Sequence, residues 1–354
     1  MNSSAAVATA GRRTLEWGAS PASSLPARVL QAALAVAAAA LSACVSPGAA
    51  GTAPSAEAPP AKRASTSRTL PAQAASQLMW SALSQGDYAS IDRVLVALHG
   101  AYLGDPGDAT TAAHIGMTQL WRVSESTRQG RPDPSTLASM ANARRFLEES
   151  VALDGTDARR QGFRASARLA EGAMHRDASL QRLGAADLQD ALQAWPQFNL
   201  FVLARNLGGA PAGSKTLQQA IDAMWQAQDL CIGGKLSRSD PDMKPYMRLE
   251  TREGVNRVCW NSAIAPHNFE GFFLEWGDLL VKSGDVALAR RIYANAKHSP
   301  AYGTWPHRAL LEARIRDADA NVARFAAPPD AAAHVPIGRA SPIACVSCHQ
   351  SETP

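Results

Sequence analysis

This sequence of 354 residues has few aromatic residues, no large excess of charge of either sign and no long apolar run. The 35 basic and 31 acidic residues leave a formal net charge of +4, a balance that argues against a nucleic-acid-binding surface. No run of about 18 strongly apolar residues occurs, which excludes a polytopic membrane protein. The chain is nevertheless 46% hydrophobic, enough for a folded core, and its length allows two or three domains or one elongated repeat array.

Alternating runs of β-branched residues are almost missing, so strands are not expected. Between residues 71 and 325 the apolar residues instead recur at helical spacing, as in residues 78–87, 138–155, 186–195 and 216–230. The breaks between these segments are short and contain Gly-Asp, Asp-Gly or Pro, which is typical of antiparallel helix neighbours. The sequence therefore predicts an all-α fold of antiparallel helix pairs over residues 71–325.

A short motif in this region occurs twice. Gly86-Asp87 and Gly284-Asp285 are each followed by an alanine two positions later and by an arginine four positions after that. Around the second copy, the residues near tetratricopeptide consensus positions are Trp276, Gly277, Ala289, Tyr293, Ala296 and Pro300. The segment resembles one tetratricopeptide unit, which implies a tetratricopeptide-like solenoid or helical array with a surface for a protein partner. A generic all-helical bundle is the alternative.

Common enzyme signatures are also missing. The sequence has no G-x-x-x-x-G-K-[ST], no H-E-x-x-H and no G-x-S-x-G motif. A helical array supplies a frame and a binding face but no chemistry of its own. The sequence therefore favours a carrier or scaffold over an enzyme.

The N-terminal segment has the pattern of an export signal. Residues 1–28 are polar with three arginines, and residues 29–43 form an apolar stretch too short to span a bilayer comfortably. This stretch ends in Leu41-Ser-Ala-Cys44, which resembles the lipobox of bacterial lipoproteins. The resemblance implies a signal peptide over residues 1–43 and a lipid on Cys44. An ordinary signal peptide with a chance cysteine is the alternative.

Residues 44–70 are rich in alanine, proline, serine, glycine and threonine, a composition that predicts a flexible tether. The residue after Cys44 is Val45 and not an aspartate. By resemblance to the sorting rules of Gram-negative lipoproteins, this implies the outer membrane, with the protein anchored there and facing the periplasm.

Residues 326–354 form a tail rich in proline and alanine that contains Cys345-Val-Ser-Cys348-His349. C-x-x-C-H is the attachment motif of c-type haem, because two thiols at this spacing can each bond to one vinyl group of the porphyrin. The imidazole of His349 then lies under the ring, where it binds iron. The motif needs an oxidising, exported location, which the N-terminal signal supplies independently. The sequence predicts one covalent haem c; a redox disulfide or half of a metal site are the alternatives.

The sixth ligand of such an iron has no downstream source, because only five residues follow His349. This departs from class I cytochromes, in which an axial methionine lies many residues after the motif. The upstream candidates, in order of preference, are His267 at a predicted helix start, Met243 and Met247 in a polar loop, and His334 in the tail. For each of them an ordinary packing, capping or surface role is the alternative, and an open sixth site is another.

Cys231 and Cys259 are the remaining cysteines, and they enclose a polar loop over residues 232–258. Two unassigned cysteines in an oxidising compartment usually pair, so we predict a disulfide. In the chain-entropy treatment its closure contributes about 3.5 kcal/mol to stability. Two buried thiols are the alternative.

Three hypotheses for the whole chain follow. The first is a lipid-anchored, periplasm-facing c-type haem protein with a helical-repeat scaffold, for electron transfer or redox partner binding. The second is a tetratricopeptide-like envelope scaffold whose C-terminal cysteines form a structural disulfide or a metal site. The third is a haem peroxidase or sensor, and it is the weakest because di-haem peroxidases carry two C-x-x-C-H motifs where this chain has one.

Overall fold

The computed structural model describes residues 62–129, 134–260, 267–305, 307–328 and 331–338. Within them the chain forms α-helices and short 3-10 turns and no strand. The helices are α2 (Leu70–Gln85), α3 (Ile91–Gly104), α4 (Ala109–Gln129), α5 (Pro134–Leu153), α6 (Ala158–His175), α7 (Ala178–Ala194), α8 (Pro196–Leu207), α9 (Lys215–Ile232), α10 (Glu270–Ser283), α11 (Val286–Asn295), α12 (Arg308–Arg316) and α13 (Ala318–Ala326). The prediction of an all-α fold is confirmed.

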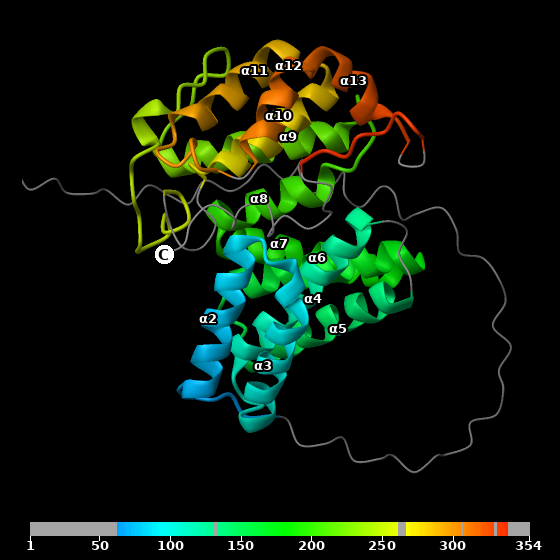
Figure 1. Cartoon of the computed structure of the whole chain (residues 1–354), viewed down its shortest axis with the longest axis vertical. Coiled ribbons are helices and arrows are strands. Elements are labelled where there is room, and N and C mark those ends of the chain that lie inside the picture. The colour runs from blue at the N-terminus through cyan, green and yellow to red at the C-terminus, as the bar shows by residue number, and fades with distance from the viewer. Residues whose placement is uncertain (1–61, 130–133, 261–266, 306, 329–330, 339–354) are drawn as a thin grey trace, which may run out of the picture. The chain divides into compact units, whose positions relative to one another are not determined.

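Consecutive helices pack as neighbouring pairs, as the short predicted breaks between them require. The pairs with the most extensive contacts are α6 with α7, α4 with α5, α8 with α9, α10 with α11, and α5 with α6, and α2 likewise packs on α3. Helix α10 also contacts α9 and α13, so it lies among its neighbours rather than at an edge (Figure 1).

The repeated Gly-Asp motif makes the same helix ending twice. Gly86 ends α2 with φ +64°, and Gly284 ends α10 with φ +93°. Both values lie in the left-handed region that glycine adopts without a steric penalty, and each glycine N–H bonds to carbonyls of the preceding turn. The carboxylate of Asp285 then caps α11 by accepting from the N–H of Leu288 at 3.1 Å.

Gly277 and Tyr293 set the close approach of α10 and α11. A Cβ atom added at Gly277 would lie 2.1 Å from Cε1 of Tyr293. The tyrosine ring therefore occupies the space that any larger residue at position 277 would need.

The largest apolar cluster extends over α8–α13 and the long loop between α9 and α10, and it includes buried residues of α6 and α7. Its fully buried side chains include Trp276, Tyr293 and Phe272. Two smaller clusters hold α2–α4 together and join α4 to α5 and α6. The loop enclosed by Cys231 and Cys259 is thus part of the main core, although its composition is polar.

The last residues of the predicted tether are held by the body. The N–H of Ser65 donates to the carbonyl of Gly107 at 3.0 Å, and Lys62 forms an ion pair with Glu149. The Arg68 guanidinium pairs with the Asp108 carboxylate at 3.0 Å. Residues 62–69 are therefore not part of the flexible tether predicted over residues 44–70. Lys62 and Arg68 instead form ion pairs with carboxylates of the body.

Candidate functional site

The residues predicted to carry lipid and covalent haem lie outside the described residues; they are Cys44, Cys345, Cys348 and His349. The two remaining cysteines and all four candidate distal ligands lie within them. The structure therefore describes the surroundings of the tail up to Gly338 and the environment of each upstream candidate.

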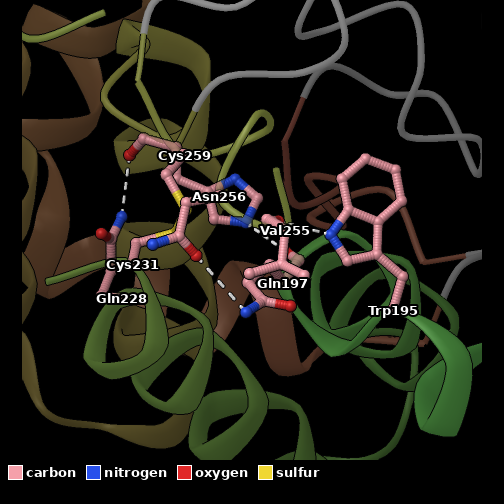
Figure 2. Close-up of a disulfide and its surroundings, with 8 residues drawn as sticks. Trp195, Gln197, Gln228, Cys231, Val255, Asn256 and Cys259 are labelled. Atoms are coloured by element: carbon pink, nitrogen blue, oxygen red, sulfur yellow. Dashed lines mark hydrogen bonds between the residues drawn. A yellow bond between two sulfur atoms is a disulfide. The ribbon is translucent and has the colours of Figure 1, made fainter. Parts of the chain in front are cut away.

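Cys231 and Cys259 are joined by a disulfide, with Cα atoms 5.4 Å apart, within the usual range for such a bond (Figure 2). Cys231 lies in the last turn of α9, and Cys259 lies in the loop before α10. The same loop is attached to α8, because the indole N–H of Trp195 donates to the carbonyl of Val255 at 2.6 Å. Both sulfur-bearing residues are buried, so the bond lies inside the fold and not on its surface.

His267 lies beside this disulfide. Its backbone N–H donates to the carbonyl of Cys259 at 3.0 Å, and its ring stacks on Phe272 with centroids 4.8 Å apart. Nε2 lies 2.6 Å from the carbonyl oxygen of Gln197, and since a carbonyl only accepts, Nε2 carries the proton. The residue is 1% exposed, so its ring is an interior hydrogen-bonding group.

Met243 and Met247 lie in the core as well. Their side chains are buried at 0% and 1% exposure and belong to the main apolar cluster. The backbone N–H of Met243 donates to Oδ1 of Asn295 at 2.8 Å, which attaches this part of the loop to α11. Neither thioether is presented to the surface.

His334 has a different environment from the other three candidates. It is half-buried, and Nδ1 lies 2.8 Å from the carbonyl oxygen of Ala327. Because a carbonyl oxygen only accepts, Nδ1 donates this bond, and Nε2 is the other ring nitrogen. Among the described residues none forms a hydrogen bond with that nitrogen.

The segment that contains His334 is docked on the body. The N–H of Val335 donates to the carbonyl of Arg324 at 3.2 Å, and the side chains of Val335 and Ile337 pack against the main apolar cluster. Arg314 of α12 donates to the carbonyl of Pro336 at 2.9 Å. Residues 331–338, which we call the strap, thus lead the chain toward its C-terminal motif from a fixed place on the body.

The strap ends on a group of buried charges. Glu275 and Asp278 of α10 are fully buried, and each has an arginine partner, Arg205 of α8 and Arg314 of α12 respectively. The N–H of Gly338 donates to Oδ2 of Asp278 at 2.7 Å, and the hydroxyl of Tyr293 donates to Oδ1. Burial raises the pKa of Asp278 to about 6, although the Arg314 charge acts in the opposite direction.

Gly338 fits this place because it has no side chain. Its φ is +66°, and an added Cβ would lie 2.2 Å from Oε1 of Glu275. Nothing in the sequence predictions pointed to this cluster. The signal for it is a pair of carboxylates, three positions apart, within residues 271–281 of α10, which are otherwise apolar or glycine.

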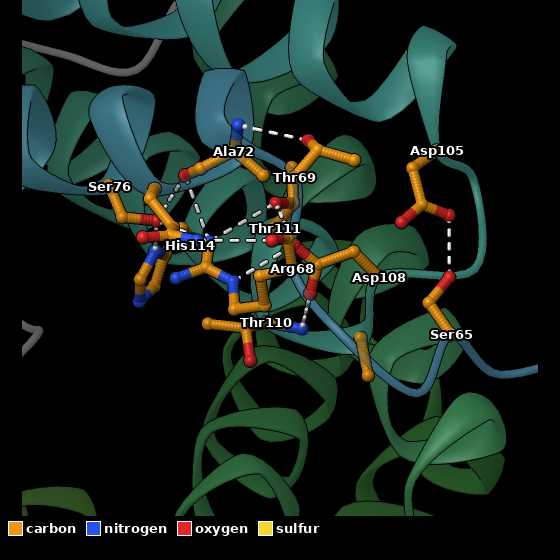
Figure 3. Close-up of polar contacts among 12 residues, drawn as sticks. Ser65, Arg68, Thr69, Ala72, Ser76, Asp105, Asp108, Thr110, Thr111 and His114 are labelled. Carbon is orange, nitrogen blue, oxygen red and sulfur yellow. Dashed lines mark hydrogen bonds and ion pairs between the residues drawn. The ribbon is translucent and has the colours of Figure 1, made fainter.

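A second polar cluster attaches the N-terminal segment to α2 and α4 (Figure 3). Arg68 donates to Oγ of Ser76 at 2.6 Å, and that oxygen lies 2.8 Å from Nδ1 of His114. Burial, and to a lesser extent the charge of Arg68, lowers the pKa of His114 to about 3. The Ser76 hydroxyl donates to the carbonyl of Ala72 at 2.9 Å, so this serine is a bridging group rather than a nucleophile.

A shallow cavity of about 310 Å³ adjoins this cluster. Its charged lining residues are paired, Arg68 with Asp108 and Arg160 with Asp154 at 2.7 Å. The cavity therefore offers no unbalanced charge to a ligand.

The described part of the chain contains no group of three or more histidine, cysteine or acidic side chains arranged to hold a metal ion. It also contains no helix that is long and apolar enough to cross a membrane.

Comparison of the chain with protein-family models, with curated proteins and with solved structures finds no match.

Proposed function

We propose that this protein is a lipid-anchored, periplasm-facing c-type haem protein that transfers electrons, with the helical array as its frame. The observation that carries the proposal is Cys345-Val-Ser-Cys348-His349 at the end of an exported chain, seven residues beyond Gly338. The strap supports it, because an elaborately docked segment directly before the motif is expected if the motif must be held at a defined place.

The haem supplies a redox-active iron when it is bound. Cys345 and Cys348 would hold the porphyrin through thioethers, and the imidazole of His349 would bind the iron. The body keeps the tail attached, and its helix pairs offer a surface for a protein redox partner. Cys44 carries the lipid, and Val45 favours the outer membrane as its location.

The test is the spectrum and intact mass of the full chain expressed with the cytochrome c maturation machinery. We expect a mass that includes one haem and a haem spectrum that survives denaturing gels, because thioethers are covalent. Replacement of Cys345 and Cys348 by alanine removes both signals and leaves the helical circular dichroism unchanged. A wild-type mass of polypeptide plus lipid alone contradicts the proposal.

The anchor is tested separately through Cys44. Labelled fatty acid is incorporated into the wild type and not into Cys44→Ser, and the wild type partitions with membranes. Stable anchoring takes more than one acyl chain, so the mass shift should correspond to several chains. Incorporation into Cys44→Ser contradicts a lipid on this residue.

The alternative from another class is a tetratricopeptide-like envelope scaffold that carries no haem. The paired helices favour it, since such arrays bind proteins without chemistry of their own. Visible absorption of purified protein separates the two, because only the haem protein has a Soret band. A high-spin haem that binds cyanide readily and turns over peroxide would instead favour the peroxidase or sensor.

A further inference from the structure

We propose that the outer side of α3 is a dimer interface, which pairs with the same surface of a second copy of this chain. This surface, which we call the α3 face, consists of Arg93, Val96, Gly100 and Leu103, all of them exposed. The pairing involves neither the haem nor the lipid, so its test is independent of theirs.

The most exposed large apolar side chains among the described residues lie in the first helix pair. Leu70 of α2 is 80% exposed, and Val96 and Leu103 of α3 are 74% and 77% exposed. On the later helices the largest value is 50%, at Leu183 of α7. Large apolar side chains that gather in contact with water mark a surface that an assembly covers, so the first pair is where a partner is expected.

The members of the α3 face lie on one side of the helix. They are spaced by three, four and three residues, which is the spacing along one side of an α-helix. The opposite side is in the core, where Val94 and Leu98 are fully buried in the cluster that α3 shares with α2 and α4. Helix α3 is therefore apolar on two sides, and the described residues cover only one of them.

Helix α2, which packs beside α3, adds no charge to this end of the array (Figure 1). Its 16 residues include no aspartate, glutamate, lysine or arginine, and Gln73, Gln77 and Ser81 are among its exposed positions. Terminal pairs of helical arrays usually carry a polar outer face that keeps the end in water. Here exposed apolar residues have an uncharged neighbour, so this end can approach its own copy without repulsion between like charges.

Gly100 lies near the middle of the α3 face, which suits a two-fold axis at this point. Such an axis sets α3 antiparallel to its copy and brings Val96 opposite Leu103 of the second copy, because these two residues lie on either side of Gly100. No atom lies within 4 Å of a Cβ added at Gly100, so two backbones can approach closely there.

The charges at the two ends of α3 are complementary in the same arrangement. Arg93 lies near the start of the helix, and Asp105 is its C-terminal cap. Within the described part of the chain both bond only to neutral groups, whereas Asp92 is already paired with Arg122. Antiparallel helices bring Arg93 of one copy beside Asp105 of the other, twice across the axis. This self-complementarity favours a second copy over an unrelated protein or a lipid surface.

The size of the surface sets the strength of the dimer. Sixteen residues of α2 make a helix about 24 Å long, and two adjacent helices are about 20 Å wide, which gives a footprint of roughly 480 Å². Stable interfaces bury about 800 Å² on each partner. The dimer is therefore expected to be reversible and to depend on protein concentration.

The first experiment is sedimentation velocity of the full chain over a range of concentrations, with Cys44→Ser so that no lipid contributes to self-association. We expect a monomer–dimer equilibrium. Val96→Glu and Leu103→Glu should each raise the dissociation constant at least about tenfold, because the dimer would bury an unpaired carboxylate at each changed site. Leu183→Glu, at the exposed leucine of α7, is the matched control and should dimerise as the parent does. Circular dichroism in the far ultraviolet reports the fold of each variant.

The second experiment places a thiol on the proposed axis. Gly100→Cys should form a disulfide between two copies under mild oxidation, and peptide mapping should locate the bond between the two introduced thiols. Gly209→Cys, at another exposed glycine with open space around its added Cβ, is the control and should not link two copies in this way.

Three outcomes overturn the inference: a parent chain that stays monomeric at every concentration, a dimer that persists unchanged in both glutamate variants, or equal crosslinking of the two cysteine variants. Vesicles of phosphatidylglycerol are added in a further arm. Binding of a monomeric chain to these vesicles that Val96→Glu abolishes also overturns the inference and assigns the α3 face to a lipid surface.

Discussion

The backbone N–H of Gly338 donates to the carboxylate of Asp278, a residue 60 positions earlier, at a distance of 2.7 Å. Asp278 is fully buried in α10, and its other oxygen accepts from Tyr293. A residue of the proline- and alanine-rich tail thus completes the coordination of a carboxylate in the main core. The tail and the body are therefore expected to depend on each other.

Gly338→Ala should release the strap. The new Cβ would meet the Glu275 carboxylate, and the left-handed backbone costs a non-glycine residue roughly 1–2 kcal/mol. Limited proteolysis of residues after 328 should accelerate by about five- to thirtyfold, because cleavage follows the population of the open segment. Gly209→Ala is the control, since nothing lies within 4 Å of its added Cβ. Equal cleavage rates for the two variants would show that the contact with α10 does not hold the strap.

The pKa of Asp278, raised to about 6, predicts a stability that falls as the pH rises. Between about pH 4 and pH 6 the folded state binds a proton at this carboxyl that the unfolded state has lost, and the difference reaches about 3 kcal/mol. The groups facing it are Glu275, Arg314, Tyr293 and the N–H of Gly338. Urea denaturation of the wild type and of Asp278→Asn across this range measures the effect. The free energy of unfolding of the wild type relative to the variant should decrease with pH; a constant difference contradicts the raised pKa.

His114 predicts the opposite dependence. Its pKa is lowered to about 3, so the unfolded state takes up a proton below about pH 6.5 while the folded state does not. Between pH 6.5 and pH 5 this costs about 2 kcal/mol of stability. His114→Gln should be less stable at neutral pH but should lose less on acidification, while the exposed His298→Ala should follow the wild type. Parallel curves for the wild type and His114→Gln would argue against a neutral buried ring.

The disulfide should be measurable both chemically and energetically. Thiol alkylation under denaturing, non-reducing conditions, followed by peptide mapping, should leave Cys231 and Cys259 unlabelled. Replacement of both by alanine should lower the free energy of unfolding by about 3.5 kcal/mol. Reductant should destabilise the wild type and have no such effect on the double variant. Labelled peptides from protein isolated without reductant would contradict the bond.

Gly277→Ala should destabilise the contact between α10 and α11. The added Cβ would lie 2.1 Å from the Tyr293 ring, and overpacking of this kind costs about 1–3 kcal/mol. Gly100→Ala, in the interior of α3 with open space around the added Cβ, should instead raise stability by up to about 1 kcal/mol. Thermal denaturation of the two variants separates packing from helix propensity. A similar gain in both would mean that α10 and α11 can move apart at little cost.

The helices could be predicted because the signals are local. The spacing of apolar residues identifies α5, α7 and α9. The Gly-Asp motif marks the ends of α2 and α10, because its glycine adopts the left-handed backbone conformation that ends a helix. The repeat-like pattern also identifies Gly277 and Tyr293 as consensus positions, whereas their contact with each other is a finding of the structure.

The strap could not be predicted in the same way. Its composition is that of a linker, and its contacts join Gly338 and Val335 to residues 60 and 11 positions earlier. The exposure of His334 relative to His267 also depends on tertiary packing, because both are single histidines near proline in the sequence. Glu275 and Asp278 are charged residues within the otherwise apolar stretch 271–281 of α10, but nothing local in the sequence indicates that the tail covers them.

The attachment of residues 62–69 limits how far the body can lie from Cys44. If the chain were mobile from Cys44 to Leu70, its 26 residues could extend to roughly 90 Å. With Ser65 and Arg68 bound to the body, the distance from Cys44 to Lys62 is at most roughly 63 Å. If Cys44 carries a lipid, as we propose, the body would lie within this distance of the membrane. A redox partner would then contact the body only close to the membrane surface.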